Sequence, residues 1–180
     1  MNLITFILII GATFIVVMNL FALYWFGGML IPLISGGGPY VPTSKDRVRR
    51  MIKLARIKPT DTVMDLGCGD GRLLIAAVKA GAKKAIGCEI HPGLVRLANY
   101  KIRKQGLQNK IEIKKESLWK TDTSKADVML LYQIPYAMEK IGDKLLKEMP
   151  SGARIVSNGF EFPEWEPIEQ EASIYLYKKS

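Results

Sequence analysis

Charged residues are missing from the first 44 positions: no Asp, Glu, Lys, Arg or His comes before Lys45. The 180-residue chain also has only two cysteines and one histidine. These are too few for a disulfide framework or a metal-ligand set, so neither a disulfide-stabilised fold nor a metal site is expected. The excess of 26 basic over 17 acidic residues, a net charge of +9, therefore belongs entirely to the part after residue 44.

An uncharged apolar run fills residues 3–34 and is longer than the roughly 20 residues that a helix needs to cross a bilayer core. It lacks the basic start, the short apolar core and the small-residue cleavage site of a signal peptide. We therefore predict a permanent single-pass anchor rather than a buried core helix. Asn19 is its one strongly polar side chain and either bonds another helix or tolerates lipid.

Seven basic residues and one acid, Asp46, lie between residues 45 and 58. By the positive-inside rule, this places the following domain in the cytoplasm beneath the cell membrane. The apolar spacing predicts a basic amphipathic helix, with Thr43 and Asp46 as its capping box. Its basic face suits anionic lipid headgroups, although a solvated face or RNA would also explain the charge. The predicted parts are an anchor (1–35), a Gly/Pro linker (36–43) and a domain (44–180).

Short apolar runs alternate with helical patterns from residue 59 onward, which predicts an α/β fold: a Rossmann-like, mostly parallel sheet with helices on both faces. Such sheets bind ligands outside the carboxyl ends of their strands. The predicted strands are 62–67, 84–90, 110–116, 126–134, 153–160 and 172–179, and the predicted helices are 71–81, 91–106 and 136–149.

The stretch "VMDLGCGDGRLLIAA" places Gly67, Gly69 and Gly71 at a turn between a strand and a helix. Missing side chains let the backbone and a helix N-terminus approach a ligand closely. Asp65 precedes the turn, would repel a phosphate and would attract an ammonium group. Glu89 ends the next strand, where its carboxylate can accept hydrogen bonds from both hydroxyls of a ribose. These features together predict a site for a nucleoside joined to an amino acid.

"MDLGCGDG" and "GCEI" resemble the first motif and the acidic second-strand end of class I, seven-β-strand, S-adenosylmethionine-dependent methyltransferases. The resemblance implies that Asp65 lies near the methionyl amino end and that Glu89 binds ribose, while Cys68 contributes only its backbone. In "ESLWK", Ser117 stands where many relatives have an Asp that contacts the adenine amine. The resemblance thus assigns S-adenosylmethionine binding to Asp65, Gly67, Cys68, Gly69, Gly71, Glu89, Ile90, Ser117 and Leu118.

A narrower resemblance covers most of the chain. The apolar start followed by "GPYVPTS", "EIHPGLV", "SLWK", "QIP" and "FEFPEW" is similar to the small membrane-bound protein-lysine methyltransferases of mitochondria. Those enzymes modify the c-subunit of ATP synthase and the adenine nucleotide translocase. The resemblance implies methyl transfer to a lysine of a protein substrate, and it implies that this substrate is an integral protein of the lipid bilayer.

Methyl transfer to an amine is an in-line displacement, so the protein must align the two reactants and keep the amine neutral. Candidates to shape the acceptor pocket follow the fourth and fifth predicted strands. They are Tyr132, Gln133 and Pro135 in the first segment, and Asn158, Glu161 and Trp165 in the second. Each also has a plain structural explanation: strand core for Tyr132, a strand-end cap for Gln133 and an aromatic cover for Trp165. His91, the only histidine, is predicted to start a helix rather than to act as a base.

Three functions remain open at this point. The favoured one is a membrane-anchored protein-lysine methyltransferase. The second is a methyltransferase for a lipid, a quinone or another small amphiphile. The third is an S-adenosylmethionine-binding membrane protein without transfer activity. RNA methylation is disfavoured because no appended RNA-binding module accompanies the basic domain, so no nucleic-acid partner is expected.

Overall fold

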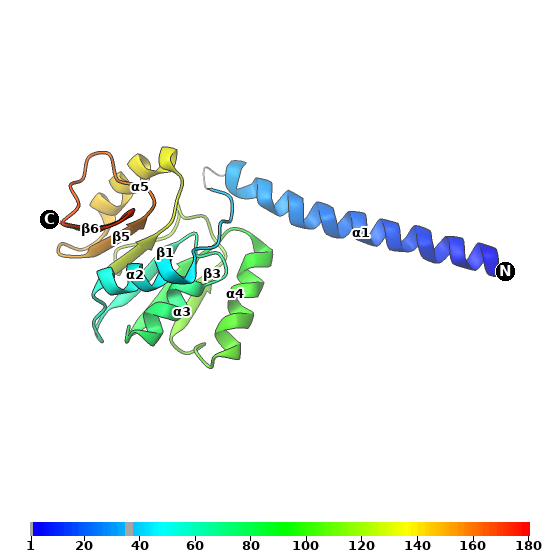
Figure 1. Ribbon diagram of the computed structural model, residues 1–180, viewed down its shortest axis with the longest axis horizontal. Coiled ribbons are helices and arrows are strands. Elements are labelled where there is room, and N and C mark those ends of the chain that lie inside the picture. Colours follow the sequence, from blue (N-terminus) through cyan, green and yellow to red (C-terminus); the bar gives the residue numbers. More distant parts are fainter. Residues whose placement is uncertain (1, 35–37) are drawn as a thin grey trace.

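Residues 2–34 and 38–180 are described by the computed structural model of the protein. Residues 35–37, which contain most of the predicted glycine hinge, lie outside the described residues. Helix α1 (Leu3–Ile34) is continuous and projects away from the rest of the chain as a long rod (Figure 1). Its stretch Leu3–Tyr24 is long and apolar enough to cross a membrane, and none of it is buried against the domain. Asn19 donates to the carbonyl of Ile15 at 2.8 Å, so its side chain is satisfied within α1.

Strand and helix alternate through most of residues 45–158, which confirms the predicted α/β fold. The strands are β1 (Thr62–Leu66), β2 (Lys84–Cys88), β3 (Ile111–Lys114), β4 (Val128–Leu131), β5 (Arg154–Asn158), β6 (Glu169–Glu171) and β7 (Ile174–Lys178). The helices are α2 (Lys45–Ala55), α3 (Arg72–Lys79), α4 (Pro92–Lys104) and α5 (Pro135–Glu148). The polar three-residue strand β6 has no apolar alternation in its sequence, and we did not predict it.

The described strands form one seven-stranded sheet in the order β3-β2-β1-β4-β5-β7-β6. Strands β1 to β5 pair in parallel, whereas β7 runs antiparallel to both β5 and β6. The chain first proceeds outward from β1 to β3 and then returns to the other side of β1 with β4. This reversal of strand order opens a crevice at the carboxyl ends of β1 and β4, where ligands bind in open α/β sheets.

Two apolar layers cover the sheet. One face packs against α2, α3 and α4, through residues such as Met51, Leu74 and Ile102. The other packs against α5, with Met138 and Ile141 buried, and against an aromatic group of the C-terminal segment. Because both faces are covered, the central strands are apolar on both sides, as the continuous run of β4 indicates.

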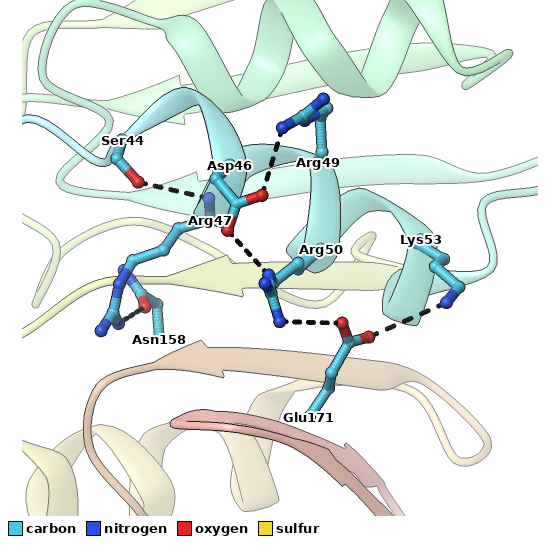
Figure 2. Close-up of polar contacts among 8 residues, drawn as sticks. All are labelled: Ser44, Asp46, Arg47, Arg49, Arg50, Lys53, Asn158 and Glu171. Carbon is cyan, nitrogen blue, oxygen red and sulfur yellow. Dashed lines mark hydrogen bonds and ion pairs between the residues drawn. The ribbon is translucent and has the colours of Figure 1, made fainter.

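The N-cap of helix α2 lies one residue later than predicted. Ser44, not Thr43, is the N-cap, and its hydroxyl accepts from the Arg47 N–H at 3.3 Å. Thr43 is buried instead, because its segment runs along the domain surface before the helix starts. The predicted capping box of Thr43 and Asp46 is therefore wrong. Asp46 bonds the side chains of Arg49 and Arg50 at 3.2 and 2.8 Å (Figure 2).

Several basic side chains of α2 form ion pairs or hydrogen bonds with residues of β5 and β6. Arg50 and Lys53 contact the carboxylate of Glu171 on β6 at 3.2 and 4.0 Å (Figure 2). Arg47 donates to Oδ1 of Asn158 at the end of β5, at 2.6 Å. Much of the positive charge expected to face lipid headgroups thus has partners within the protein, and each such exposed pair contributes only about 0–1 kcal/mol.

Candidate functional site

A cavity of about 270 Å³ lies at the carboxyl ends of β1, β2 and β4. This volume is near the lower end of the roughly 300–1,000 Å³ that small-molecule sites occupy. Its walls come from the glycine turn after β1, the segments after β2, β3 and β4, and residues 38–43 before α2. The cavity therefore sits at the reversal of strand order, where the sequence predicts a ligand.

The cavity has two unlike halves. We call the acidic half the part lined by Asp65, Glu89 and Glu116, which come from β1 and from the segments that follow β2 and β3. We call the neutral half the part lined by Tyr132, Gln133, Ile134 and Phe160, which follow β4 and β5. Sequence reasoning found the first two acids but not Glu116, whose only sequence signal is its position two residues after a strand end.

The three glycines of the turn have left-handed backbones, with φ of +80° at Gly67, +54° at Gly69 and +76° at Gly71. A Cβ on Gly67 would clash with Nε2 of Gln133. A Cβ on Gly69 would lie 2.6 Å from the ring of Tyr40, and one on Gly71 would lie 3.3 Å from Cβ of Ala98. Glycine is thus required here by close protein neighbours as well as by backbone conformation.

Glu89 holds the glycine turn in place. Its Oε2 accepts from the Gly69 N–H at 3.0 Å, and its Oε1 accepts from the His91 N–H at 2.8 Å. Each carboxylate oxygen accepts more than one hydrogen bond, so both retain capacity toward a ligand. Glu89 therefore supports the turn and lines the cavity at once, a double role that the sequence did not reveal.

Asp65 is 3% exposed and lines the cavity from β1. Burial, followed by the nearby charges of Glu89 and Asp70, raises its pKa to about 8. A carboxyl with so high a pKa gains most from a cationic partner, which would compensate its buried charge. The site therefore suits a ligand that brings an ammonium group to this position.

Asp70 serves a different purpose, although it also borders the cavity. Its buried carboxylate bonds Arg72 and Lys101 at 2.6 and 2.5 Å. Burial opposes ionisation of Asp70, but these two bonds outweigh it and hold its pKa below the usual range. Arg72 also donates to the Thr43 carbonyl at 2.6 Å and to the Tyr40 hydroxyl at 3.3 Å. The network fastens residues 40–43 beside the glycine turn, so this predicted linker forms part of the site.

The remaining residues predicted to bind the cofactor fall into two groups. Cys68, Ile90, Ser117 and Leu118 line the cavity, and burial raises the pKa of the Cys68 thiol well above its usual value. Gly71 is the N-cap of α3 and faces α4 rather than the cavity. A place in the cavity wall does not by itself establish that a residue binds a cofactor, so these roles stay predictions.

The predicted acceptor residues after β4 are near one another. Tyr132 and Gln133 line the neutral half, whereas Pro135 is the first residue of α5 and is not among the residues that line the cavity. Gln133 is 7% exposed and donates from Nε2 to the Leu66 carbonyl at 2.7 Å, across the strand boundary. This bond fixes the amide beside Gly67, as a strand-end cap would. Their catalytic roles also stay predictions.

The predicted acceptor residues at the end of β5 and after it, Asn158, Glu161 and Trp165, are not among the residues that line the cavity. Asn158 is fully buried and bonded to Arg47, and Glu161 raises the pKa of Tyr175 through a hydrogen bond. The Trp165 ring packs 5.0 Å from the ring of Phe162, as an aromatic cover. Phe160, which sequence reasoning did not single out, is the residue of this segment that lines the cavity.

His91 caps α4: its Nδ1 accepts from the N–H groups of Gly93 and Leu94 at 3.0 and 3.3 Å. This confirms the predicted helix-start role.

The acidic half fits S-adenosylmethionine: it offers a buried carboxyl for an ammonium group, a second carboxylate for hydroxyls, and a glycine turn open to close approach.

Comparisons with known proteins agree with this chemistry. A family model described as the ANTKMT methyltransferase domain matches residues 65–169. A protein-lysine N-methyltransferase of Saccharolobus islandicus is 38% identical over 148 residues, which cover 77% of this chain and 92% of that protein. The adenine nucleotide translocase lysine N-methyltransferase of Mus musculus is 35% identical over 72% of this chain, and the match spans 56% of that longer protein.

Among solved structures, the chain is similar to an RNA methyltransferase from Salinibacter ruber in complex with S-adenosyl-L-homocysteine. The TM-score is 0.71 and the identity 34%, over 77% of this chain and 92% of that one. The bound product supports the assignment of S-adenosylmethionine as the cofactor. The relatives are nevertheless named for different methyl acceptors: lysine for the two sequence relatives, and RNA for the solved structure.

Proposed function

The chain belongs to the family of the ANTKMT methyltransferase domain and is an S-adenosylmethionine-dependent protein-lysine methyltransferase, and from this premise we propose that it methylates a lysine of an integral membrane protein. In this proposal, α1 is a single-pass anchor in the cell membrane, and the catalytic domain is cytoplasmic. The basic segment that follows the uncharged span supports this orientation.

The observation that carries the proposal is the position of residues 38–43. Gly38 comes four residues after Ile34, the last residue of α1, and it already lines the cavity. A cavity joined so closely to a membrane span stays near the bilayer surface. Any acceptor held in the same membrane then has a high effective concentration at the cavity. The mouse relative, which is named for a lysine of the adenine nucleotide translocase, supports the same class of acceptor.

The acidic half is proposed to hold the cofactor. Asp65 accepts hydrogen bonds from the ammonium group of its amino-acid part, and Glu89 accepts them from the ribose hydroxyls while it holds the Gly69 N–H. When bound, S-adenosylmethionine supplies a methyl group on a positively charged sulfur, which is a good leaving group. The residues of this half therefore contribute alignment, which can account for about 7–11 kcal/mol of a barrier.

The neutral half is proposed to receive the lysine side chain. A lysine has a pKa near 10.4 in water, so its amine must lose a proton before it can attack. Among the described residues, no acid of the segments after β4 and β5 lines the cavity, and such surroundings disfavour the ammonium form. Gln133, fixed by its bond to Leu66, keeps an amide oxygen in place as a hydrogen-bond acceptor for the amine.

The proposal is tested with the full-length protein in vesicles of cell membranes, supplied with methyl-labelled S-adenosylmethionine. We expect label in membrane protein and none with the Glu89→Ala variant. Label in lipid or quinone would replace the acceptor by a small amphiphile, and label in added RNA would favour the RNA acceptor of the structural relative. Cofactor binding without any transfer would point to a non-catalytic membrane protein.

Anchoring is tested separately. Alkaline carbonate should fail to extract the protein, and protease added to intact cells should leave its domain uncut. A matched chain that lacks residues 1–34 should be released into the wash. Release of the full-length chain would show a peripheral protein instead.

A further inference from the structure

Helix α4 carries exposed positive charge on one side. Residues 92–110 hold five basic residues and no acid. The side chains at positions i, i+4, i+7 and i+8 of α4 share one side of the helix and are exposed, and we call them the basic face of α4: Arg96, Tyr100, Arg103 and Lys104. Among the described residues, no acid forms an ion pair with any of its three basic members.

The basic helix α2 differs in this respect. Its Arg50 and Lys53 contact the carboxylate of Glu171, so part of its charge is compensated within the protein. Arg103 of α4 donates to the carbonyl of Asn99 at 3.3 Å, but a neutral carbonyl leaves the charge of the guanidinium uncompensated. The basic face of α4 is therefore better suited than α2 to an anionic partner outside the chain.

The basic face of α4 also lies beside the end of the apolar span. Helices α1 and α4 are in contact, and Nη1 of Arg96 donates to the hydroxyl of Tyr24 at 3.3 Å. Tyr24 is the last residue of the stretch Leu3–Tyr24, which is long and apolar enough to cross a membrane. Tyrosines are enriched where a span meets the lipid headgroups, and arginines reach toward them. Arg96 is thus at the level where α1 would leave the bilayer core.

The direction of α4 suits a flat surface at this level. In the view of Figure 1, α4 lies on the side of the domain from which α1 projects, and it runs crosswise to α1. A membrane span is tilted by only about 20° on average from the bilayer normal, so a helix crosswise to it runs roughly along the membrane surface. The bond from Arg96 to Tyr24 turns the basic face toward the span rather than away from it.

We propose that the basic face of α4 lies on anionic lipid headgroups and so fixes the orientation of the domain on the membrane. This proposal rests on the proposed role of α1 as an anchor. Each basic residue near an anionic surface favours contact roughly fivefold, so the three of this face favour the docked orientation about 100-fold. An RNA would also match the charge, but the contact with the end of the span favours lipid.

The test uses the full-length protein in nanodiscs of phosphatidylcholine, with or without phosphatidylserine. A fluorescent dye is attached to the Tyr100→Cys variant, within the basic face, and both kinds of disc contain a lipid whose headgroup spin label quenches the dye on contact. Cys68 and Cys88 are buried, so the protein without the substitution is the labelling blank. The dye should be quenched at least about twofold more strongly with phosphatidylserine, and high salt should remove the difference.

Two double variants of equal charge are compared in the same labelled protein. Arg103→Gln with Lys104→Gln should abolish the effect of phosphatidylserine, because two of the three charges of the face are lost. Lys79→Gln with Lys83→Gln removes the same charge from exposed positions between α3 and β2 and should leave the effect unchanged. Circular dichroism verifies that each variant is folded, and the two single substitutions replace a double variant that is not.

Equal quenching with and without phosphatidylserine would overturn the proposal. An effect that survives the loss of Arg103 and Lys104, or that falls equally in both double variants, would overturn it as well. Dye emission that responds to added RNA but not to phosphatidylserine would assign the face to RNA instead. Carbonate extraction tests the anchor separately, so the basic face can fail while the anchor stands, and a failed anchor is recognised by its own result.

Discussion

The two halves of the cavity differ in charge and in how each is held. Asp65, Glu89 and Glu116 line the acidic half, and the pKa of Asp65 is raised there to about 8. In the neutral half, the polar side chain of Gln133 is fixed by a bond to a backbone carbonyl. Ionised carboxylates in the acidic half thus cost free energy in the empty protein, and a bound cation or bound hydroxyl groups would offset that cost. In the neutral half, the Gln133 amide already has a hydrogen-bond partner within the protein.

This difference indicates a division of labour between binding and reaction. Buried acids select a ligand that carries positive charge and hydroxyl groups, because only such a ligand compensates them. A neutral, apolar surface instead favours the uncharged form of an amine. Changes in the acidic half should therefore alter cofactor affinity, and changes in the neutral half should alter turnover.

The largest effect is expected from the acids themselves. Asp65→Ala and Glu89→Ala should each weaken S-adenosylhomocysteine binding about 100-fold, because each removes hydrogen bonds to charged or buried groups. Glu89→Ala also frees the Gly69 N–H and loosens the turn. Calorimetry measures the change, with Glu112→Ala, an exposed acid paired to Lys84, as the control. Unchanged affinity in both variants would remove the division between the two halves.

A side chain on the glycine turn should have the next largest effect. Gly69→Val places atoms where the Tyr40 ring lies and forces a β-branched residue to a φ of +54°. We expect cofactor affinity to fall about 30-fold, together with a loss of stability from backbone strain of about 1–3 kcal/mol. Gly81→Val is the matched control, since Gly81 also has a positive φ but no atom within 4 Å of its Cβ position. It should lose stability but keep its affinity, and equal affinity losses in both variants would contradict a specific role for Tyr40.

The raised pKa of Asp65 predicts a pH dependence of binding. Deprotonation favours the ammonium-bearing ligand, so affinity for S-adenosylhomocysteine should rise about tenfold from pH 6.5 to pH 8. The folded-state pKa lies above the usual value of 3.8, so the empty folded protein holds a proton that the unfolded chain has lost. Its contribution to stability is therefore full below about pH 4 and is lost as pH rises toward 8. Asp65→Asn should flatten both dependences, and a persistent slope in that variant would assign them to another group.

The smallest effect is expected in the neutral half. Gln133→Met keeps the volume of the side chain but removes its amide, so turnover should fall about three- to tenfold, the value of one hydrogen bond. S-adenosylhomocysteine affinity should stay within about twofold. Steady-state kinetics and calorimetry on the same preparation separate the two quantities. A loss of affinity without a loss of turnover would reverse the assignment of the two halves.

The sequence was informative about the acidic half because its chemistry is local. Asp65 and the glycines are neighbours in one turn, and Glu89 ends the next strand, so strand ends and residue types suffice to place them together. The α/β fold was predictable for the same reason, since each element carries its own pattern of apolar residues.

Contacts between distant residues were not predictable in this way. Tyr40 lies against Gly69, and Gln133 bonds Leu66 across 67 positions of the chain. The position of Glu116 in the cavity wall depends on how the segment after β3 turns. Such contacts follow from tertiary packing, which has no periodic signal in the sequence.

The central claim is that the cavity transfers methyl groups to a lysine of a membrane protein. It is tested most directly by mass spectrometry of lysines in membranes from cells with the protein, without it, and with the Glu89→Ala variant. The account predicts at least one membrane-protein lysine that is methylated only in cells with the active protein. Identical lysine methylation in all three membranes, with the active protein present and bound to its cofactor, would contradict it.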